Sequence, residues 1–386
     1  MALYSLLVVA SAGLAFVYML KLKSDPPVGR FWMQAIILGW FSLLVAGLPF
    51  LATGIPIDLS FPADRGTLPM IFGVSLLFVG ILDGLFRRKV YKIALISLAV
   101  GLAVGAHLLT AISFQRDWNI QRAFFNQLVW RVPDLTPGTA LYYSYTIALR
   151  DFRSTDNSLT APLNWIYASD LSSGELSYGL FDLRLRQKSI LPNPERGLPI
   201  SKQYGDFSFR GSTDSVLVIS FDPPGCLRVL HPQYDTLQPQ LPDSLIEALP
   251  ISNLGLINTS PNSPDKLPKN IFGDESDRDW CYNFEKADLA RQQGDWQQVV
   301  EIGEQALKRS NGPKHYSELV PFIQGYAHVG KWSRAKELTI ETLELSELMQ
   351  PMLCSIWSDL TKSTPDSDDK TAVLDVLLTT LNCTLK

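Results

Sequence analysis

The sequence has few of the residues, and none of the short motifs, on which most enzymes depend. Its 386 residues include four histidines and four cysteines. It contains no Gly-x-Ser-x-Gly, no Gly-x-Gly-x-x-Gly and no Gly-x-x-x-x-Gly-Lys-[Ser/Thr] string, so the usual signatures of serine hydrolases, dinucleotide enzymes and nucleotide-triphosphate hydrolases are missing. We therefore expect no cofactor, and we expect this chain by itself to be a non-enzymatic protein.

Ligands for a metal ion are not grouped either. No two cysteines form a Cys-x-x-Cys pair, and His231, His315 and His328 do not stand at ligand intervals from one another or from a cysteine. The sequence therefore predicts no metal site.

The cysteines are all in the second part of the chain, at Cys226, Cys281, Cys354 and Cys383. An even number of cysteines permits disulfides where the compartment is oxidising. Four cysteines allow three pairings, and their spacing does not choose among them.

The second part of the chain also has fewer basic than acidic residues. Residues 1–113 hold eight basic and four acidic residues, so the net charge of −4 for the whole chain leaves −8 on residues 114–386. Nucleic-acid-binding domains are usually basic, so nucleic acid is excluded as an expected partner.

What the chain has in abundance is long apolar runs. They occupy residues 2–20, 31–52, 68–86 and 93–114. Each is close to the ~20 residues that a helix needs to cross about 30 Å of hydrocarbon. Residues 1–114 are therefore predicted to form a region of four transmembrane helices within the lipid bilayer.

The loops between these runs indicate the orientation. Lys21, Lys23 and Arg30 lie between the first two runs, and residues 87–92 add four more basic side chains, whereas the loop 53–67 contains one arginine. Basic loops stay in the cytoplasm. We expect a multi-pass protein of the cell membrane in which Met1 and everything after residue 114 face outside. An apolar run that opens directly at the first residue is also what a piece of a longer multi-pass protein would show.

Two ionisable residues fall within the apolar runs. Asp83 stands four residues before Arg87, which favours an interfacial ion pair over a transport role. His107 lies deeper, where a single imidazole bonded to a neighbouring helix is the simpler interpretation and a proton relay the alternative. Small residues around it, such as Gly101 and Gly105, favour close helix packing.

Residues 115–230 have the pattern of a small external α/β domain. An amphipathic helix is expected over 115–130, a second helix over 157–168, and strands over 140–147, 206–210, 215–221 and 226–230, which gives a sheet of four strands. The polar residues Asp151, Arg153, Asp156 and Asn157 follow the first strand, where a solvated loop and a site at the end of a sheet are both open. Residues 231–278, rich in proline, serine and asparagine, are expected to be an irregular linker.

Helical repetition appears in residues 279–386. Gly294 and Trp296 recur 36 positions later as Gly330 and Trp332. In each copy the glycine would end a first helix, and the tryptophan would begin a second helix and pack on the turn. These residues resemble the tetratricopeptide repeat, which implies stacked helix pairs with a protein-binding surface, and residues 353–381 would supply capping helices.

The chain resembles the C-terminal half of a group of uncharacterised multi-pass bacterial membrane proteins. The strings that carry this likeness are Asp-Arg-Gly-Thr-Leu-Pro at 64–69, Gln-Arg-Asp-Trp-Asn-Ile-Gln-Arg at 115–122, Asp-Asn-Ser-Leu-Thr-Ala-Pro-Leu-Asn-Trp-Ile-Tyr at 156–167 and Asp-Trp-Cys-Tyr-Asn-Phe-Glu-Lys-Ala at 279–287. The plan is also similar to lipid-dependent glycosyltransferases of the GT-C type, which implies a lipid-linked sugar as ligand. Asp58 and Asp64 lie in an external loop and are the residues we can offer as the acid of such an enzyme, although neither matches the family's acid residue by residue.

These observations lead to two hypotheses of different kinds. The first is an integral membrane protein whose extracytoplasmic region binds or organises a protein partner through its helical repeats, in a bacterial envelope complex. The second is the C-terminal part of a membrane glycosyltransferase. The repeat pattern and the missing catalytic signature favour the first.

Overall fold

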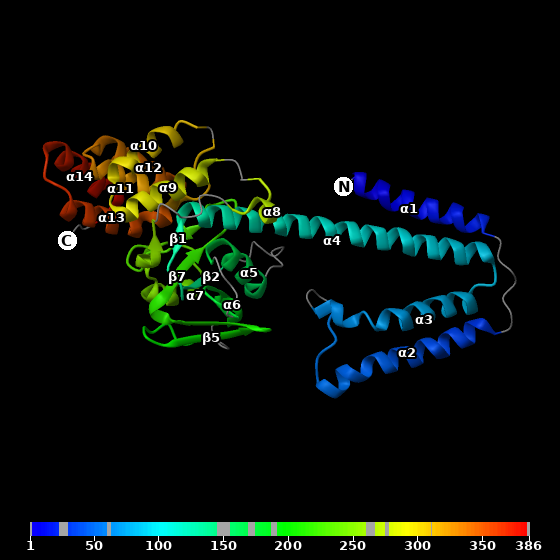
Figure 1. The fold of residues 1–386 in the computed structure, drawn as a ribbon. Coiled ribbons are helices and arrows are strands. Elements are labelled where there is room, and N and C mark those ends of the chain that lie inside the picture. Colours follow the sequence, from blue (N-terminus) through cyan, green and yellow to red (C-terminus); the bar gives the residue numbers. More distant parts are fainter. Residues whose placement is uncertain are drawn as a thin grey trace. The chain divides into compact units, whose positions relative to one another are not determined.

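The computed structural model describes residues 2–22, 30–59, 63–144, 155–168, 174–186, 191–259, 267–274, 278–309 and 311–383 (Figure 1). The chain divides into two compact units, Met1–Arg116 and Asp117–Lys386. The predicted boundary at residue 114 falls close to this division. Lys23, Asp151 and Arg153, which entered the predictions above, lie outside the described residues.

The first unit is built from long apolar helices. They are α1 (Ala2–Lys21), α2 (Phe31–Thr53), α3 (Met70–Leu85) and the first part of α4 (Lys89–Arg131), with a short 3-10 helix η1 (Ala63–Thr67) before α3. Three segments, Leu3–Lys21, Phe31–Thr53 and Lys89–Arg131, are long and apolar enough to cross a membrane. α3 has 16 residues, which at 1.5 Å per residue is short of the ~20 needed, so the fourth span stays a prediction.

The helix α4 joins two elements that the sequence analysis treated separately. The apolar run that was expected over 93–114 continues into the amphipathic stretch 115–130 as one helix of 43 residues. Neither glycine nor proline occurs between Gly105 and Arg131, so nothing in the backbone interrupts the helix. It ends at Arg131, because Pro133 disfavours helical geometry at the residue before it.

Glycines let the helices of the first unit approach closely. A Cβ atom on Gly73 of α3 would lie 2.9 Å from the carbonyl oxygen of Gly39 in α2. Between α1 and α4, a Cβ atom on Gly101 would lie 2.9 Å from the carbonyl oxygen of Val8, and one on Gly105 would lie 2.7 Å from the hydroxyl of Tyr4. The expected close packing is therefore present at both glycines of α4, as is common between membrane helices.

The ionisable residues of this unit differ in their surroundings. Asp83 forms its ion pair with Lys92 of α4, so the pairing with Arg87 was wrong. The reason is that Lys92 lies in the first turn of α4, where its ammonium group reaches the carboxylate of Asp83 near the end of α3. His107 is exposed on the surface of the unit.

The centre of the second unit is a four-stranded sheet in the order β4 (Gly179–Asp182), β2 (Ala140–Ser144), β7 (Val216–Ser220) and β8 (Arg228–Val229). β2 is parallel to both of its neighbours, and β8 is antiparallel to β7. Every residue of β2 and of β7 is buried. Continuous burial is the expected pattern for strands covered on both faces.

Each face of this sheet has its own cover. On one face, the last turns of α4 and the helix α5 (Asp156–Tyr167) pack on Leu141 and Leu217. On the other face, α7 (Asp243–Ala248) and the 3-10 helix η5 (Leu249–Ile251) pack on Tyr142 and Val218. Successive strand residues point to opposite faces, which explains the division between the two cores.

Two further small sheets flank the main one. One contains β3 (Glu175–Leu176), β6 (Phe207–Ser212) and β5 (Pro199–Tyr204), and the other pairs β1 (Asp134–Leu135) with β9 (Ile257–Asn258). The strand expected over 206–210 therefore belongs to a separate hairpin, and the fourth strand of the main sheet is β4 instead. The sequence of β4, Gly-Leu-Phe-Asp, is too short to show an alternating pattern.

The segment expected to be a linker is largely folded. Besides α7 and η5 it contains the short helices η4 (Asp235–Leu237), η6 (Leu254–Leu256) and α8 (Lys269–Phe272). Leu241 belongs to the same core cluster as Leu183 of α6 (Leu183–Arg186). Leu245, Leu249 and Ile251 are almost fully buried. The prediction of an irregular linker was wrong for these residues. Prolines and serines separate their apolar side chains in the sequence, but in the fold these side chains pack together on one face of the sheet.

The C-terminal part of the second unit consists of three consecutive helix pairs (Figure 1). They are α9 (Trp280–Gln293) with α10 (Trp296–Ala306), α11 (Val320–His328) with α12 (Trp332–Leu345), and α13 (Gln350–Ser363) with α14 (Asp368–Leu381). The 3-10 helices η7 (Tyr316–Leu319) and η8 (Glu347–Met349) precede α11 and α13, and a further 3-10 helix, η3 (Thr213–Ser215), precedes β7. Gly294 and Gly330 have φ values of 75° and 80° at the first two turns. This left-handed geometry favours glycine. Their predicted role as helix ends is seen here, while the repeat family stays a prediction.

Candidate functional site

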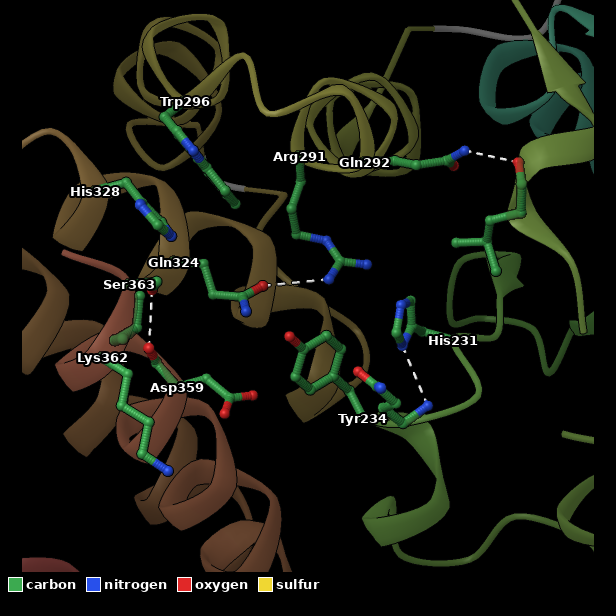
Figure 2. Close-up of a pocket in the computed structure, with 13 residues that line it drawn as sticks. His231, Tyr234, Arg291, Gln292, Trp296, Gln324, His328, Asp359, Lys362 and Ser363 are labelled. Atoms are coloured by element: carbon green, nitrogen blue, oxygen red, sulfur yellow. Dashed lines mark hydrogen bonds between the residues drawn. The ribbon is translucent and has the colours of Figure 1, made fainter. Parts of the chain in front are cut away.

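A polar pocket lies in the second unit, between the helix pairs and the segment that follows β8 (Figure 2). Its volume is about 620 Å³, within the range of roughly 300 to 1,000 Å³ that ligand sites occupy. Helices α9, α10, α11 and α13 each contribute side chains, so the wall needs all three helix pairs to be in place. The lining residues are His231, Gln233, Tyr234, Leu254, Arg291, Gln292, Trp296, Gln324, His328, Asp359, Leu360, Lys362 and Ser363.

The cation at the centre of the pocket is held by a buried carboxylate. Arg291 donates from Nε to Oδ1 of Asp288 at 2.8 Å and from Nη1 to Oε1 of Gln324 at 3.2 Å. The other oxygen of Asp288 accepts from Nε of Arg131 at 2.6 Å. Burial opposes ionisation of Asp288, but the two guanidinium groups outweigh it and hold the pKa of this carboxyl below its usual range. Arg291 is thus fixed in position by Asp288 behind the wall and by Gln324 in the lining itself.

A second set of buried polar contacts joins the α/β part to the helices. Glu318 accepts the backbone N–H of Cys226 at 2.8 Å and the indole N–H of Trp280 at 2.7 Å. Cys226 is in turn disulfide-bonded to Cys281, 55 residues further along the chain. Burial raises the pKa of Glu318, although hydrogen bonds from three backbone N–H groups and from the Trp280 indole act against this rise. These links hold the two sides of the pocket together as one structure.

The remaining cysteines also form a pair in the structure. Cys354 is bonded to Cys383, with Cα atoms 5.8 Å apart, which ties α13 to the end of α14. The geometry therefore selects one of the three possible pairings, Cys226–Cys281 with Cys354–Cys383.

Two pairs of aromatic rings line the pocket from opposite sides (Figure 2). On the helices, Trp296 stacks on His328 with ring centroids 3.8 Å apart, and in the segment after β8 the ring centroids of His231 and Tyr234 are 4.6 Å apart. Burial lowers the pKa of His328, and burial together with the charge of Arg291 lowers the pKa of His231. Both imidazoles are therefore expected to be neutral at pH 7.

The tautomer of one imidazole follows from its neighbour. Nδ1 of His231 accepts the backbone N–H of Gln233 at 3.2 Å, so in the neutral ring the proton is assigned to Nε2. This leaves His231 as a hydrogen-bond donor at the pocket.

Amide and charged side chains make up the rest of the lining. Gln292 donates from Nε2 to the carbonyl of Leu254 at 2.9 Å, while its buried Oε1 accepts no hydrogen bond from the part of the chain that the structure describes. Asp359 and Lys362 project from α13, as Figure 2 shows. Oε1 of Gln292 has almost no accessible surface, so it does not face the open space of the pocket, and the amide of Gln292 serves to hold the segment at Leu254.

Only some of the residues singled out from the sequence meet at this pocket. Trp296 lines it, whereas Trp332 is buried in the helical core and the glycines Gly294 and Gly330 form turns. Asp58 and Asp64 are exposed in the first unit, between α2 and α3, and Asp83 and His107 also belong to that unit. The pocket residues come from positions far apart in the chain, and no local pattern marks them.

The polar cluster that follows β2 has a structural role where it is described. Asp156 is fully buried and accepts from Nε of Arg186 at 2.6 Å and from Nζ of Lys202 at 2.7 Å. These two cations lower the pKa of Asp156 although burial acts against them. The cluster therefore ties α5 to α6 and β5.

The comparisons with known proteins add no relative. No protein-family model matches the chain, and neither a curated protein nor a solved structure matches it. Over the residues that the structure describes, no group of three or more His, Cys, Asp or Glu side chains is placed to hold a metal ion. What the pocket offers is fixed charge, amide hydrogen bonds and aromatic surface, which are means of recognition.

Proposed function

We propose that this chain is a membrane protein whose second unit lies outside the cytoplasm and binds a polypeptide partner in the polar pocket. The single observation that carries the proposal is the pocket itself, about 620 Å³ in volume and lined from all three helix pairs. Stacked helix pairs create extended surfaces that proteins use to bind other chains. The envelope location is supported by the basic loops of the first unit and by two disulfides, which persist in oxidising compartments.

The location can be tested through the thiols. Cys354 and Cys383 are half-buried, so after mild reduction we expect a membrane-impermeant maleimide to label them in intact cells. A cysteine introduced by Arg88→Cys, in the loop that is predicted to be cytoplasmic, should be labelled only after lysis. The reverse pattern would place the second unit in the cytoplasm.

Binding can be tested with a photo-crosslinking amino acid at Ser363 on the rim of the pocket, in the full chain in its own membrane. We expect one discrete polypeptide adduct, identified by mass spectrometry. It should disappear when Gln233→Trp fills the pocket mouth, because Gln233 is an exposed lining residue. The same amino acid at Glu341, an exposed position of α12 that does not line the pocket, is the matched control.

Two results would contradict the proposal. Equal adducts from Ser363 and Glu341 would show random collision, and the pocket would not be the binding site. An adduct carrying a lipid-linked sugar in place of a polypeptide would favour the alternative, in which the chain is part of a membrane glycosyltransferase.

A further inference from the structure

We infer that the pocket recognises an acidic stretch of polypeptide, with a side-chain carboxylate on Arg291, a second attraction from the charge of Lys362, and neighbouring peptide groups on the glutamine side chains. This inference rests on the proposed function and adds the chemical class of the segment that binds. Three features of the pocket carry it: its charge, the free donors of its cations, and its amides.

The charge of the lining is opposite to that of the unit around it. Arg291 and Lys362 stand against a single carboxylate in the lining, Asp359. Behind the wall, Asp288 is shared between Arg291 and Arg131, and the carboxyl of Asp235, whose pKa is raised by burial, also lies near Arg291. By contrast, residues 114–386 carry a net charge of −8. A local excess of positive charge on an acidic unit favours an anionic group at that place.

Arg291 and Lys362 both have N–H groups that no described residue accepts from. Arg291 contacts Asp288 through Nε and Nη2 and Gln324 through Nη1, so two of the five N–H groups that a guanidinium carries have no partner among the described residues. Within the same described part of the chain, the ammonium of Lys362 makes no ion pair, and its side chain is exposed. A ligand carboxylate accepting from the guanidinium of Arg291 would form charge-assisted hydrogen bonds, which are stronger than neutral ones, and the ammonium of Lys362 adds positive charge to the same lining.

The amides match the groups that a polypeptide backbone presents. Gln233 and Gln324 bring amide groups to the lining, with Oε1 of Gln324 already accepting from Arg291 and its amide nitrogen left as a donor. An extended chain offers an N–H donor and a C=O acceptor at each residue, and these must be satisfied when they leave water. His231 adds a donor from Nε2. A neutral sugar could also form hydrogen bonds with this lining, but it would not neutralise the positive charge of Arg291 and Lys362.

The experiment is calorimetric titration of the full chain in detergent micelles with three matched probes. They are an N-acetylated, C-amidated alanine pentapeptide with a central glutamate, and the same peptide with glutamine or lysine in the centre. We expect the glutamate peptide to bind about tenfold more tightly than the glutamine peptide, since charge-assisted hydrogen bonds differ from neutral ones by about that factor. The lysine peptide should bind most weakly.

Two variants with the same change of charge locate the effect. Lys362→Glu should remove the preference for glutamate, because it places a second carboxylate beside Asp359. Lys308→Glu is the control, since Lys308 is exposed after α10 and does not line the pocket. An equal loss in both variants would mean a general charge effect and would overturn the inference.

Other outcomes separate the inference from the function on which it rests. If the three peptides bind equally well and Gln233→Trp blocks them all, the pocket binds polypeptide but not through a carboxylate, and only the inference fails. If no peptide binds while a neutral disaccharide does, both the inference and the polypeptide-binding function are wrong.

Discussion

Replacing Trp332 with alanine is expected to lower the free energy of unfolding of the second unit by about 3 to 5 kcal/mol, the usual effect of truncating a buried tryptophan. Trp332 begins α12, its side chain is 5% exposed, and its ring centroid lies 6.3 Å from that of Trp357 in α13. The cavity left by the indole would therefore separate two helix pairs. For a unit of this size we expect the thermal midpoint to fall by roughly 10 °C. Near-ultraviolet circular dichroism of the full chain in detergent would follow it.

Trp296→Ala is the matched comparison, because the sequence gives both tryptophans the same role. Trp296 is half-buried and stacks on His328 in the wall of the pocket. Its loss should cost about 1 kcal/mol and chiefly reduce binding. Equal shifts in the two midpoints would mean that the two turns are equivalent and that our distinction between core and pocket wall is wrong.

The sequence predicts best where one local property decides the structure. Long apolar runs leave few alternatives to membrane helices, and three such helices are present. The turns after α9 and α11 could be placed because Gly294 and Gly330 allow a left-handed backbone at low cost. In each case the determining residues are close together in the sequence.

The sequence predicts structure less well where contacts between distant segments determine it. The residues after His231 read as a linker, because their prolines and serines hide the apolar positions that α7 and η5 contribute to the sheet. Likewise, β4 was not recognised as a strand, since four residues with no alternation become one only through pairing with β2. These elements are stabilised by pairing and packing with distant segments, which override the weak secondary-structure preference of their own sequences.

The pocket shows the same limitation. His231 and His328 were read as isolated histidines, and Arg291 and Gln324 had no assigned role, yet all four line one cavity. Their positions depend on how three helix pairs stack against the segment after β8. The Cys226–Cys281 pairing is similar, since spacing alone left three possibilities and the structure brings these two cysteines together.

Replacing Asp288 with asparagine is expected to have a comparable effect on stability, for an electrostatic reason. Asp288 is 5% exposed and binds Arg131, whose side chain is fully buried, as well as Arg291. Removing one partner of a buried ion pair leaves an uncompensated charge, which costs about 3 to 5 kcal/mol. Chemical unfolding of the full chain at pH 7 would measure this loss.

The pH dependence identifies the carboxylate as the cause. Because the pKa of Asp288 is lower in the folded protein than the ordinary value of about 3.9, its contribution to stability is complete above that value and is lost as the pH falls through the folded pKa. The difference between the natural protein and Asp288→Asn should therefore be constant from pH 6 to pH 8 and shrink below about pH 4. Glu304→Gln is the control, since Glu304 pairs with Lys331 at 3.3 Å on the exposed surface, where ion pairs contribute little. A variant Asp288→Asn as stable as the natural protein at pH 7 would contradict this prediction and show that the buried guanidinium of Arg131 does not depend on the Asp288 carboxylate.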